Sequence, residues 1–191
     1  MERNFTLIVL FAALIVVLGL VPAIPLAFGV PITMQSLGVM LAGAVLGSWR
    51  GALAVLLVLL LVALGLPVLA GGRGGLGVFV GPTAGFLIGW LPAAFVTGLV
   101  VERLRALPLG IVAGIGSVLG GIVVLYLFGI VGFYLIKNAG LAADDAARMT
   151  WTKAITIMSP FIPGDVLKAV IAGVLTQTIA RYRPSALLAR G

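Results

Sequence analysis

The stretch Ser159-Pro160-Phe161-Ile162-Pro163-Gly164-Asp165-Val166-Leu167-Lys168 opens the last long apolar run of the chain and places an acid and a base inside it. Its two prolines followed by a glycine interrupt any helix that arrives from upstream, whereas the fixed backbone angle of Pro163 suits the first turn of a new helix. We therefore predict a helix that begins at Pro163. Asp165 then lies in the first turn, where a carboxylate favours the positive end of the helix dipole, and Lys168 projects from the same face.

An ionisable side chain inside a membrane helix costs roughly 2.5 to 3.5 kcal/mol, so Asp165 and Lys168 need partners, a water-filled cavity or a ligand. Three interpretations follow. The pair forms a substrate site, or it serves an intramembrane transferase or hydrolase with Asp165 as general base, or it is a structural ion pair in a membrane scaffold. The enzyme interpretation is opposed by the lack of a nucleophile arrangement, a metal cluster or a second acid near the pair.

The composition identifies an integral membrane protein. Of the 191 residues, 62% are hydrophobic and 9% are charged, whereas soluble domains carry about 25% charged residues. The sequence contains neither cysteine nor histidine, which excludes disulfides, thiolate or imidazole metal sites and histidine-based catalysis. We expect no metal and no cofactor. The net charge of +7 comes from basic residues at the ends of apolar runs, where they set orientation, so we expect no nucleic acid partner.

The chain reads as one all-α transmembrane domain over residues 1–191 with six helices. A helical span needs about 20 apolar residues, and the apolar segments are 5–21, 32–49, 51–66, 83–101, 109–136 and 163–180. Most arginines of the connections lie on one side, which predicts that both termini are cytoplasmic. The polar segment 137–153 is expected to lead into a short interfacial or re-entrant helix before Pro160.

The connection 67–82 is too apolar for a solvated linker and too rich in glycine for a helix. Such backbone at membrane depth is tolerated only where it lines protein or a cavity, so we predict a loop folded over a site. The segment 72–77 matches G-x-G-x-x-G, but no strand or βαβ unit surrounds it, which excludes a dinucleotide site. No P-loop motif occurs in the sequence, so we expect no ATP binding by this chain.

Several short motifs, taken in their order and spacing, give the chain a resemblance to a known family. They are Pro31-Ile32-Thr33-Met34-Gln35, Gly65-Leu66-Pro67-Val68, Ala70-Gly71-Gly72, Gly81-Pro82-Thr83 and Pro160-Phe161-Ile162-Pro163-Gly164-Asp165 with Lys168. On these, the chain resembles the BioY family, the biotin-specific S components (substrate-binding subunits) of energy-coupling factor (ECF) transporters. The resemblance implies a six-helix membrane fold and high-affinity capture of biotin from outside. It also implies a multi-pass location in the bacterial plasma (inner) membrane, with a membrane coupling subunit of the EcfT type and two ATPase subunits as partners.

The residues fit such a ligand. The ureido ring of biotin offers two N–H donors and a carbonyl acceptor, so Asp165 is expected to accept from an N–H while Lys168 donates to the carbonyl. Arg73 is expected to bind the carboxylate. The remaining predicted site residues are Gly71, Gly72 and Gly74, which let the loop close over the ligand, Thr33 and Gln35 as secondary contacts, and an apolar wall of Phe28, Leu69, Val78 and Phe86.

Two departures from the family pattern affect these expectations. Phe86 stands where the family usually has a tyrosine after Gly-Pro-Thr, so the hydroxyl contact of that tyrosine is missing. Family members often dock their coupling subunit through A-x-x-x-A on the first helix, but Ala12 and Ala13 are followed here by Val16 and Val17.

Overall fold

The computed structural model describes residues 2–23, 32–142 and 145–190, and these residues form helices and loops without a strand. An isolated antiparallel bridge joins Leu69 and Arg73. The helices are α1 (Glu2–Gly19), α2 (Gln35–Leu46), α3 (Ser48–Ala63), α4 (Ala84–Arg103), α5 (Leu109–Val118), α6 (Leu125–Asn138), α7 (Trp151–Met158) and α8 (Ile162–Tyr182). Short 3-10 turns η2 (Leu76–Phe79), η4 (Ser159–Phe161) and η5 (Pro184–Ala186) and the π-helix η3 (Leu119–Val124) complete the set. The prediction of an all-α protein is confirmed.

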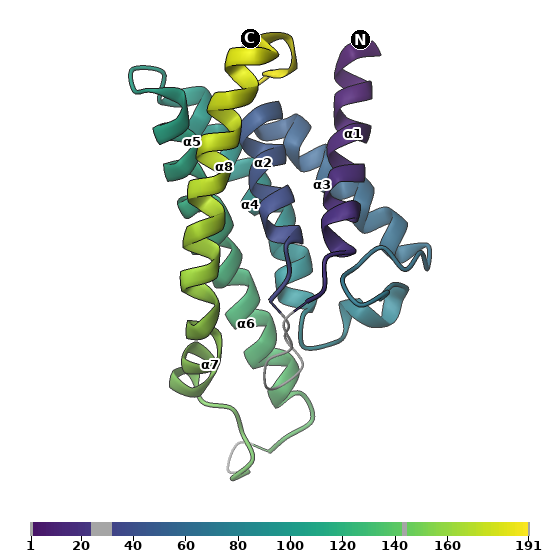
Figure 1. Cartoon of the computed structure of the whole chain (residues 1–191). Helices are drawn as coiled ribbons and strands as arrows, with labels where there is room; N and C mark the ends of the chain where they lie inside the picture. The colour runs from purple at the N-terminus through teal and green to yellow at the C-terminus, as the bar shows by residue number, and fades with distance from the viewer. Residues whose placement is uncertain (1, 24–31, 143–144, 191) are drawn as a thin grey trace.

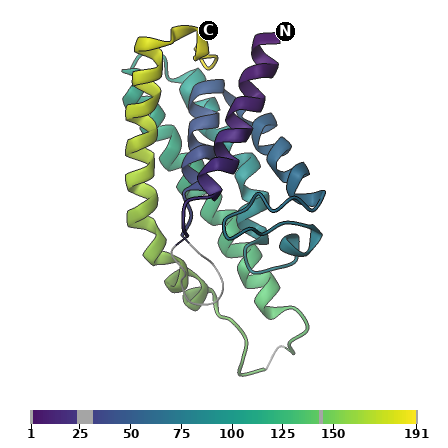
Figure 2. The same ribbon diagram turned by 45° about the vertical axis from the view of Figure 1, so that its right-hand side comes forward.

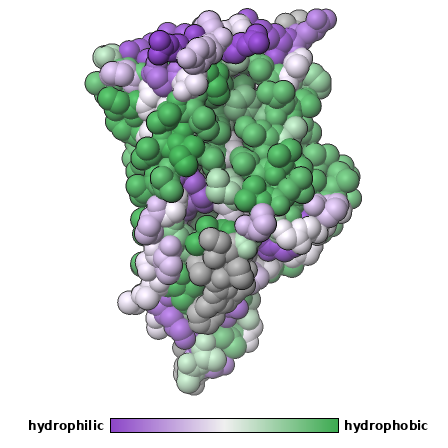
Figure 3. Space-filling view, in the orientation of Figure 1, coloured by the Kyte–Doolittle hydropathy of each residue, from purple (hydrophilic) through white to green (hydrophobic). Residues whose placement is uncertain are grey.

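Within the described ranges, four helical stretches are long and apolar enough to cross a membrane: Glu2–Gly19, Ala84–Arg103, Leu109–Asn138 and Trp151–Tyr182. Their exposed surface forms a broad hydrophobic band between two more hydrophilic ends (Figure 3). The chain is therefore a multi-pass membrane protein. Both termini lie at the same end of the molecule (Figures 1 and 2).

The second helix is shorter than the apolar segment 32–49 suggested, and the third helix equals the segment 51–66 in length but begins and ends three residues earlier. α2 has 12 residues and α3 has 16, and at 1.5 Å per residue α2 spans only about 18 Å. The two helices meet at Gly47, whose φ of 89° breaks the helical backbone and lets α3 begin at Ser48. A boundary at residue 50 was wrong because it overlooked this left-handed glycine.

α2 occupies the centre of the bundle, since every one of its residues is buried. It packs against α1, α3, α4 and α8, so protein rather than lipid surrounds it. Glycine allows the closest of these approaches: a Cβ atom on Gly43 would overlap the carbonyl oxygen of Ala94 on α4. A short helix is tolerated here because its ends and sides face other helices.

The expected long fifth segment is a single helical run, Leu109–Asn138, interrupted by η3. In this π-helix the hydrogen bonds run from i to i+5, so the residues that follow are rotated relative to those of a continuous α-helix. α6 begins directly after it, and its first two residues are Leu125 and Tyr126.

A short helix, α7, precedes Pro160 as predicted, and η4 and α8 follow it directly in one helical run, Trp151–Tyr182. Its interfacial or re-entrant position stays a prediction. α8 begins at Ile162, one residue earlier than expected, with Pro163 in its first turn. Trp151 at the start of α7 stacks on Tyr134 of α6, with ring centroids 3.7 Å apart. The chain thus reaches Asp165 through a run of helical turns that changes type at the prolines.

The C-terminal segment after α8 packs back onto the bundle at the end that carries both termini. The backbone N–H groups of Leu188 and Ala189 donate to the carbonyl oxygen of Val45, near the end of α2. Arg190 donates to the carbonyl oxygens of Leu104 (2.8 Å) and Leu107 (3.3 Å), beyond the end of α4. The contacts to Val45 and Leu104 satisfy carbonyl groups that the ends of α2 and α4 otherwise leave without partners, and Leu107 lies in the connection between α4 and α5.

Candidate ligand-binding site

A cavity is lined by residues from the N-terminal parts of α2, α4 and α8, and these helices begin away from the end of the molecule that carries both termini (Figure 1). The side chains that line it are Ile32, Thr33, Gln35, Ser36, Leu69, Arg73, Thr83, Phe86, Leu87, Trp90, Leu125, Tyr126, Phe161, Asp165 and Lys168. Segments that are far apart in the sequence therefore meet at one site.

Asp165 and Lys168 form an ion pair at one end of the cavity, with 2.8 Å between Nζ and Oδ1. Asp165 is 6% exposed and Lys168 is 5% exposed, so both charges are buried. As predicted, Asp165 lies in the first turn of α8 and the two side chains share a face. Burying two charges is costly unless further hydrogen bonds satisfy them.

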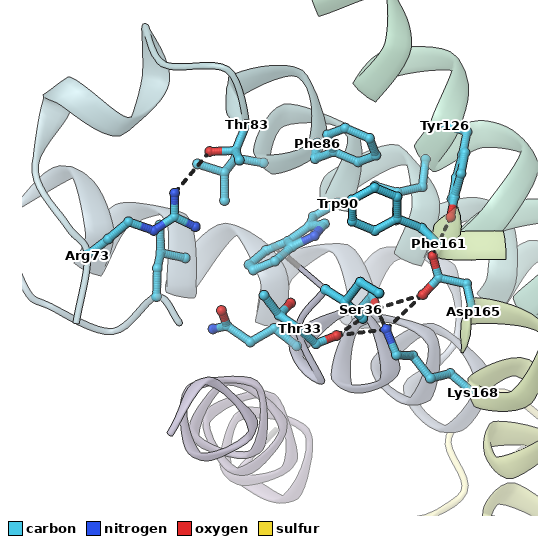
Figure 4. A pocket seen from close by; sticks show the side chains of 15 residues that line it. Thr33, Ser36, Arg73, Thr83, Phe86, Trp90, Tyr126, Phe161, Asp165 and Lys168 are labelled. Carbon is cyan, nitrogen blue, oxygen red and sulfur yellow. Dashed lines mark hydrogen bonds and ion pairs between the residues drawn. The ribbon is translucent and has the colours of Figure 1, made fainter. Parts of the chain in front are cut away.

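The N-terminal end of α2 supplies those hydrogen bonds for the ammonium group. Lys168 Nζ donates to the backbone carbonyl of Thr33 at 2.7 Å and to Ser36 Oγ at 2.9 Å, besides its bond to Asp165. An ammonium group has three donors, so these contacts occupy all of them. Thr33, predicted as a ligand contact, contributes its carbonyl group to this network (Figure 4).

The carboxylate of Asp165 receives hydrogen bonds from two further side chains. The Tyr126 hydroxyl donates to Oδ2 at 2.7 Å, and Ser36 Oγ donates to Oδ1 at 3.3 Å. Tyr126 comes from α6 and Ser36 from α2. The pair is therefore the centre of a network that joins three helices inside an apolar bundle.

Arg73 lies at the opposite side of the cavity from the ion pair, with Trp90 between them (Figure 4). Its Nε donates to the carbonyl oxygen of Ala70 at 3.1 Å, and its Nη1 is 3.5 Å from Thr83 Oγ1, which is longer than an ordinary hydrogen bond. Within residues 2–23, 32–142 and 145–190, the ion pair at Asp165 is the only one found. No described carboxylate neutralises Arg73.

The glycine-rich loop forms the tight turn that carries Arg73. Gly72 N donates to the carbonyl oxygen of Leu69 at 3.0 Å, and Gly71 and Gly72 have φ values of 77° and 69°, which favour glycine. Gly71, Gly72 and Gly74 are absent from the residues that line the cavity. A Cβ atom on Gly74 would overlap the carbonyl oxygen of Leu66. These glycines therefore determine the conformation of the turn without contacting the cavity.

Gln35 lines the cavity, but its amide is engaged with the protein. Nε2 donates to the carbonyl oxygens of Ile15 (3.3 Å) and Val68 (3.1 Å), and Oε1 accepts from the backbone N–H of Ala70 at 2.9 Å. The fully buried Gln35 thus fastens the glycine loop to α1 and α2. The structure gives Gln35 a positioning role, and its predicted ligand contact stays a prediction.

The walls between the two polar ends are apolar and largely aromatic. Phe86 meets Tyr126 edge to face, with ring centroids 6.0 Å apart. Of the other predicted wall residues, Leu69 lines the cavity, Val78 does not, and Phe28 falls outside the described residues. Sequence reasoning missed Ser36, Trp90, Tyr126 and Phe161 as cavity residues. For Ser36, Trp90 and Tyr126 the available signal was a polar or amphipathic side chain within an otherwise apolar run, whereas Phe161 gave no such signal.

The model of the BioY family matches residues 2–185 of the sequence. This chain belongs to the BioY family. A biotin transporter BioY of Rhodobacter capsulatus is 74% identical over 191 residues, which is 100% of both chains. A biotin transporter BioY of Rhizobium etli is 55% identical over 93% of this chain and 92% of its own length. The crystal structure of the S component for biotin from an ECF-type ABC transporter superimposes with a TM-score of 0.84 at 30% identity, covering 94% of this chain and 92% of that one.

Proposed function

We propose that this BioY family member is the high-affinity biotin-binding subunit of an ECF-type transporter. The observation that carries the proposal is one cavity with a buried Asp165–Lys168 pair at one end, an arginine without a described carboxylate partner at the other, and aromatic walls between them. Such a cavity suits an elongated ligand with a hydrogen-bonding head, an apolar middle and an anionic tail. Biotin has this pattern, and the relatives bear the name of biotin transporters.

The polar ends of the cavity set the orientation of the ligand. The cyclic urea lies beside Asp165 and Lys168, the fused rings lie against Trp90 and Phe86, and the carboxylate of the side chain reaches Arg73. Arg73 is suited to a carboxylate because its planar guanidinium donates two parallel hydrogen bonds. The turn formed by Gly71, Gly72 and Gly74 moves with Arg73 and covers the tail, with Thr33 and Gln35 holding the surrounding backbone.

The protein acts as a carrier subunit and leaves biotin chemically unchanged. Membership of the BioY family and the fold shared with an S component leave the intramembrane enzyme without support. A membrane coupling subunit of the EcfT type and two ATPase subunits supply the energy, and no cofactor is required. The chain crosses the bacterial plasma (inner) membrane six times as one domain, with both termini cytoplasmic and the cavity open to the outside.

The proposal is tested by calorimetric titration of biotin into the detergent-solubilised protein. We expect nanomolar binding by the wild type and a loss of about 2 to 5 kcal/mol of binding free energy in Asp165→Asn, which truncates one side of a buried charged network. Asp145→Asn is the matched control, since it makes the same change in the loop between α6 and α7. A folded wild-type protein that fails to bind biotin refutes the function, and normal binding by Asp165→Asn places the site elsewhere.

A further inference from the structure

The donors of Lys168 and Tyr126 at the polar end of the cavity are engaged within the protein, whereas acceptor positions on Asp165 and Tyr126 remain unused. Lys168 uses all three of its hydrogens on Thr33, Ser36 and Asp165, and the hydrogen of the Tyr126 hydroxyl is used on Asp165. A carboxylate accepts about four hydrogen bonds. Among the described residues, three donors reach Asp165 and none reaches the Tyr126 oxygen. The unused capacity is therefore one acceptor position on the carboxylate and the lone pairs of the phenolic oxygen.

These two acceptors lie side by side. Tyr126 Oη and Asp165 Oδ2 are 2.7 Å apart, and both residues line the cavity and are less than 10% exposed. One N–H group from a ligand can be shared between two such oxygens in a three-centre hydrogen bond. A ligand group without a hydrogen would bring its own lone pairs against the carboxylate, and a site built for a donor rejects such an analogue strongly.

The helix that carries Tyr126 contains the feature that orients it. The π-helix η3 ends at Val124, two residues before Tyr126, and changes the rotation of the residues that follow. Gly121 within η3 approaches the side chain of Met40 on α2, and Gly129 of α6 approaches the ring of Phe86, so the segment is closely packed on both sides of Tyr126. The tyrosine is held at the carboxylate by backbone geometry and by its edge-to-face contact with Phe86.

We infer that Tyr126 is a specificity-determining residue, which together with Asp165 reads one N–H group of the cyclic urea of the ligand. The inference rests on the proposed function, because it assigns a role within the binding of biotin. Lys168, whose donors are all engaged within the protein, holds the carboxylate and the start of α2 in place for this contact.

The test combines variants with altered ligands. Biotin and two analogues, each with one ureido N–H replaced by a ring oxygen, are titrated into the wild type, Tyr126→Phe and the matched control Tyr134→Phe. Tyr134 lies on the same helix, stacked on Trp151 and outside the cavity. Tyr126→Phe is expected to weaken biotin binding roughly ten- to hundredfold, to lose this effect with one of the two analogues, and to keep it with the other.

Two results overturn the inference. Tyr126→Phe binds biotin as tightly as the wild type, or it weakens all three ligands equally, as a purely structural role would. Absence of biotin binding by the wild type is a different failure, because it refutes the proposed function and the role of Tyr126 falls with it.

A second measurement does not depend on Tyr126→Phe folding. The chain has three tyrosines, so Tyr134→Phe/Tyr182→Phe leaves Tyr126 alone for labelling with 3-fluorotyrosine. Its fluorine NMR resonance is expected to move when biotin saturates the site and to move less with the analogue that lacks the N–H it reads. A resonance that biotin leaves unmoved refutes the assignment.

Discussion

The most informative perturbation separates the structural role of the ion pair from its role in binding. Lys168→Met removes the ammonium group and leaves the Asp165 carboxylate buried, with the Thr33 carbonyl and Ser36 losing their donor. Breaking a buried ion pair by removing one partner costs about 3 to 5 kcal/mol. We therefore expect Lys168→Met to be less stable by about that amount and to bind biotin about 2 to 5 kcal/mol more weakly, which corresponds to roughly 30- to 4,000-fold.

The double variant Asp165→Leu/Lys168→Met removes both charges together. Replacing a buried pair by apolar residues of similar volume is often neutral or stabilising, so this variant is expected to recover most of the stability that Lys168→Met loses. Its biotin binding is expected to stay at least as weak as that of Lys168→Met, because no acceptor for the N–H remains on α8. Stability is measured by unfolding in a denaturing detergent, and binding by calorimetry on the same preparations.

Two outcomes contradict this reasoning. If Lys168→Met unfolds like the wild type, the three hydrogen bonds of its ammonium group contribute nothing measurable. If the double variant binds biotin normally, the pair is a structural element of a scaffold and the ligand lies elsewhere in the molecule.

Further predictions concern the loop and the end that carries the termini. Arg73→Ala is expected to weaken biotin binding about tenfold or more and to leave the uncharged biotin amide unaffected; equal losses for both ligands would remove the carboxylate contact. Gly72→Val is expected to slow association and dissociation of biotin, measured by stopped flow, because valine does not hold a φ of 69°; Gly77→Val, where a Cβ meets open space and φ is not positive, is the control. Arg190→Met is expected to lower stability by about 1 to 2 kcal/mol through loss of the hydrogen bonds to Leu104 and Leu107, without changing biotin affinity; an unchanged unfolding transition would contradict the capping role.

The features that could be predicted from the sequence are local ones, which residues close together in the chain determine. The start of α8 follows from Pro163, and the shared face of Asp165 and Lys168 follows from their spacing of three on a helix. The turn around Gly72 follows from residues within the same loop. Each of these features depends on backbone preferences over one or two turns, and those preferences can be inferred from the residue types alone.

The features that could not be predicted from the sequence are contacts between segments that are far apart in the chain. Ser36 lies 132 residues from Lys168, and Tyr126 lies 39 residues from Asp165. Gln35 was a candidate ligand contact because it is polar at the mouth of a helix, but loop carbonyls and an N–H take up its amide. The π-helix that orients Tyr126 arises in an apolar, glycine-containing run whose composition also fits an ordinary α-helix.

The polar network around Asp165 and Lys168 is already hydrogen-bonded within the protein, and this determines which part of the cavity contributes most to ligand affinity. Because Lys168 and Asp165 are already hydrogen-bonded without a ligand, a cyclic urea that enters the cavity adds few net hydrogen bonds at the polar end, and its N–H groups lose their bonds to water. We therefore expect the favourable free energy to come chiefly from burying the fused rings against the apolar walls and from the proposed contact between the carboxylate and Arg73. The network contributes selectivity, since an analogue without the matching N–H leaves a buried carboxylate facing lone pairs. A site of this kind discriminates at its polar end and holds its ligand along the rest of the cavity.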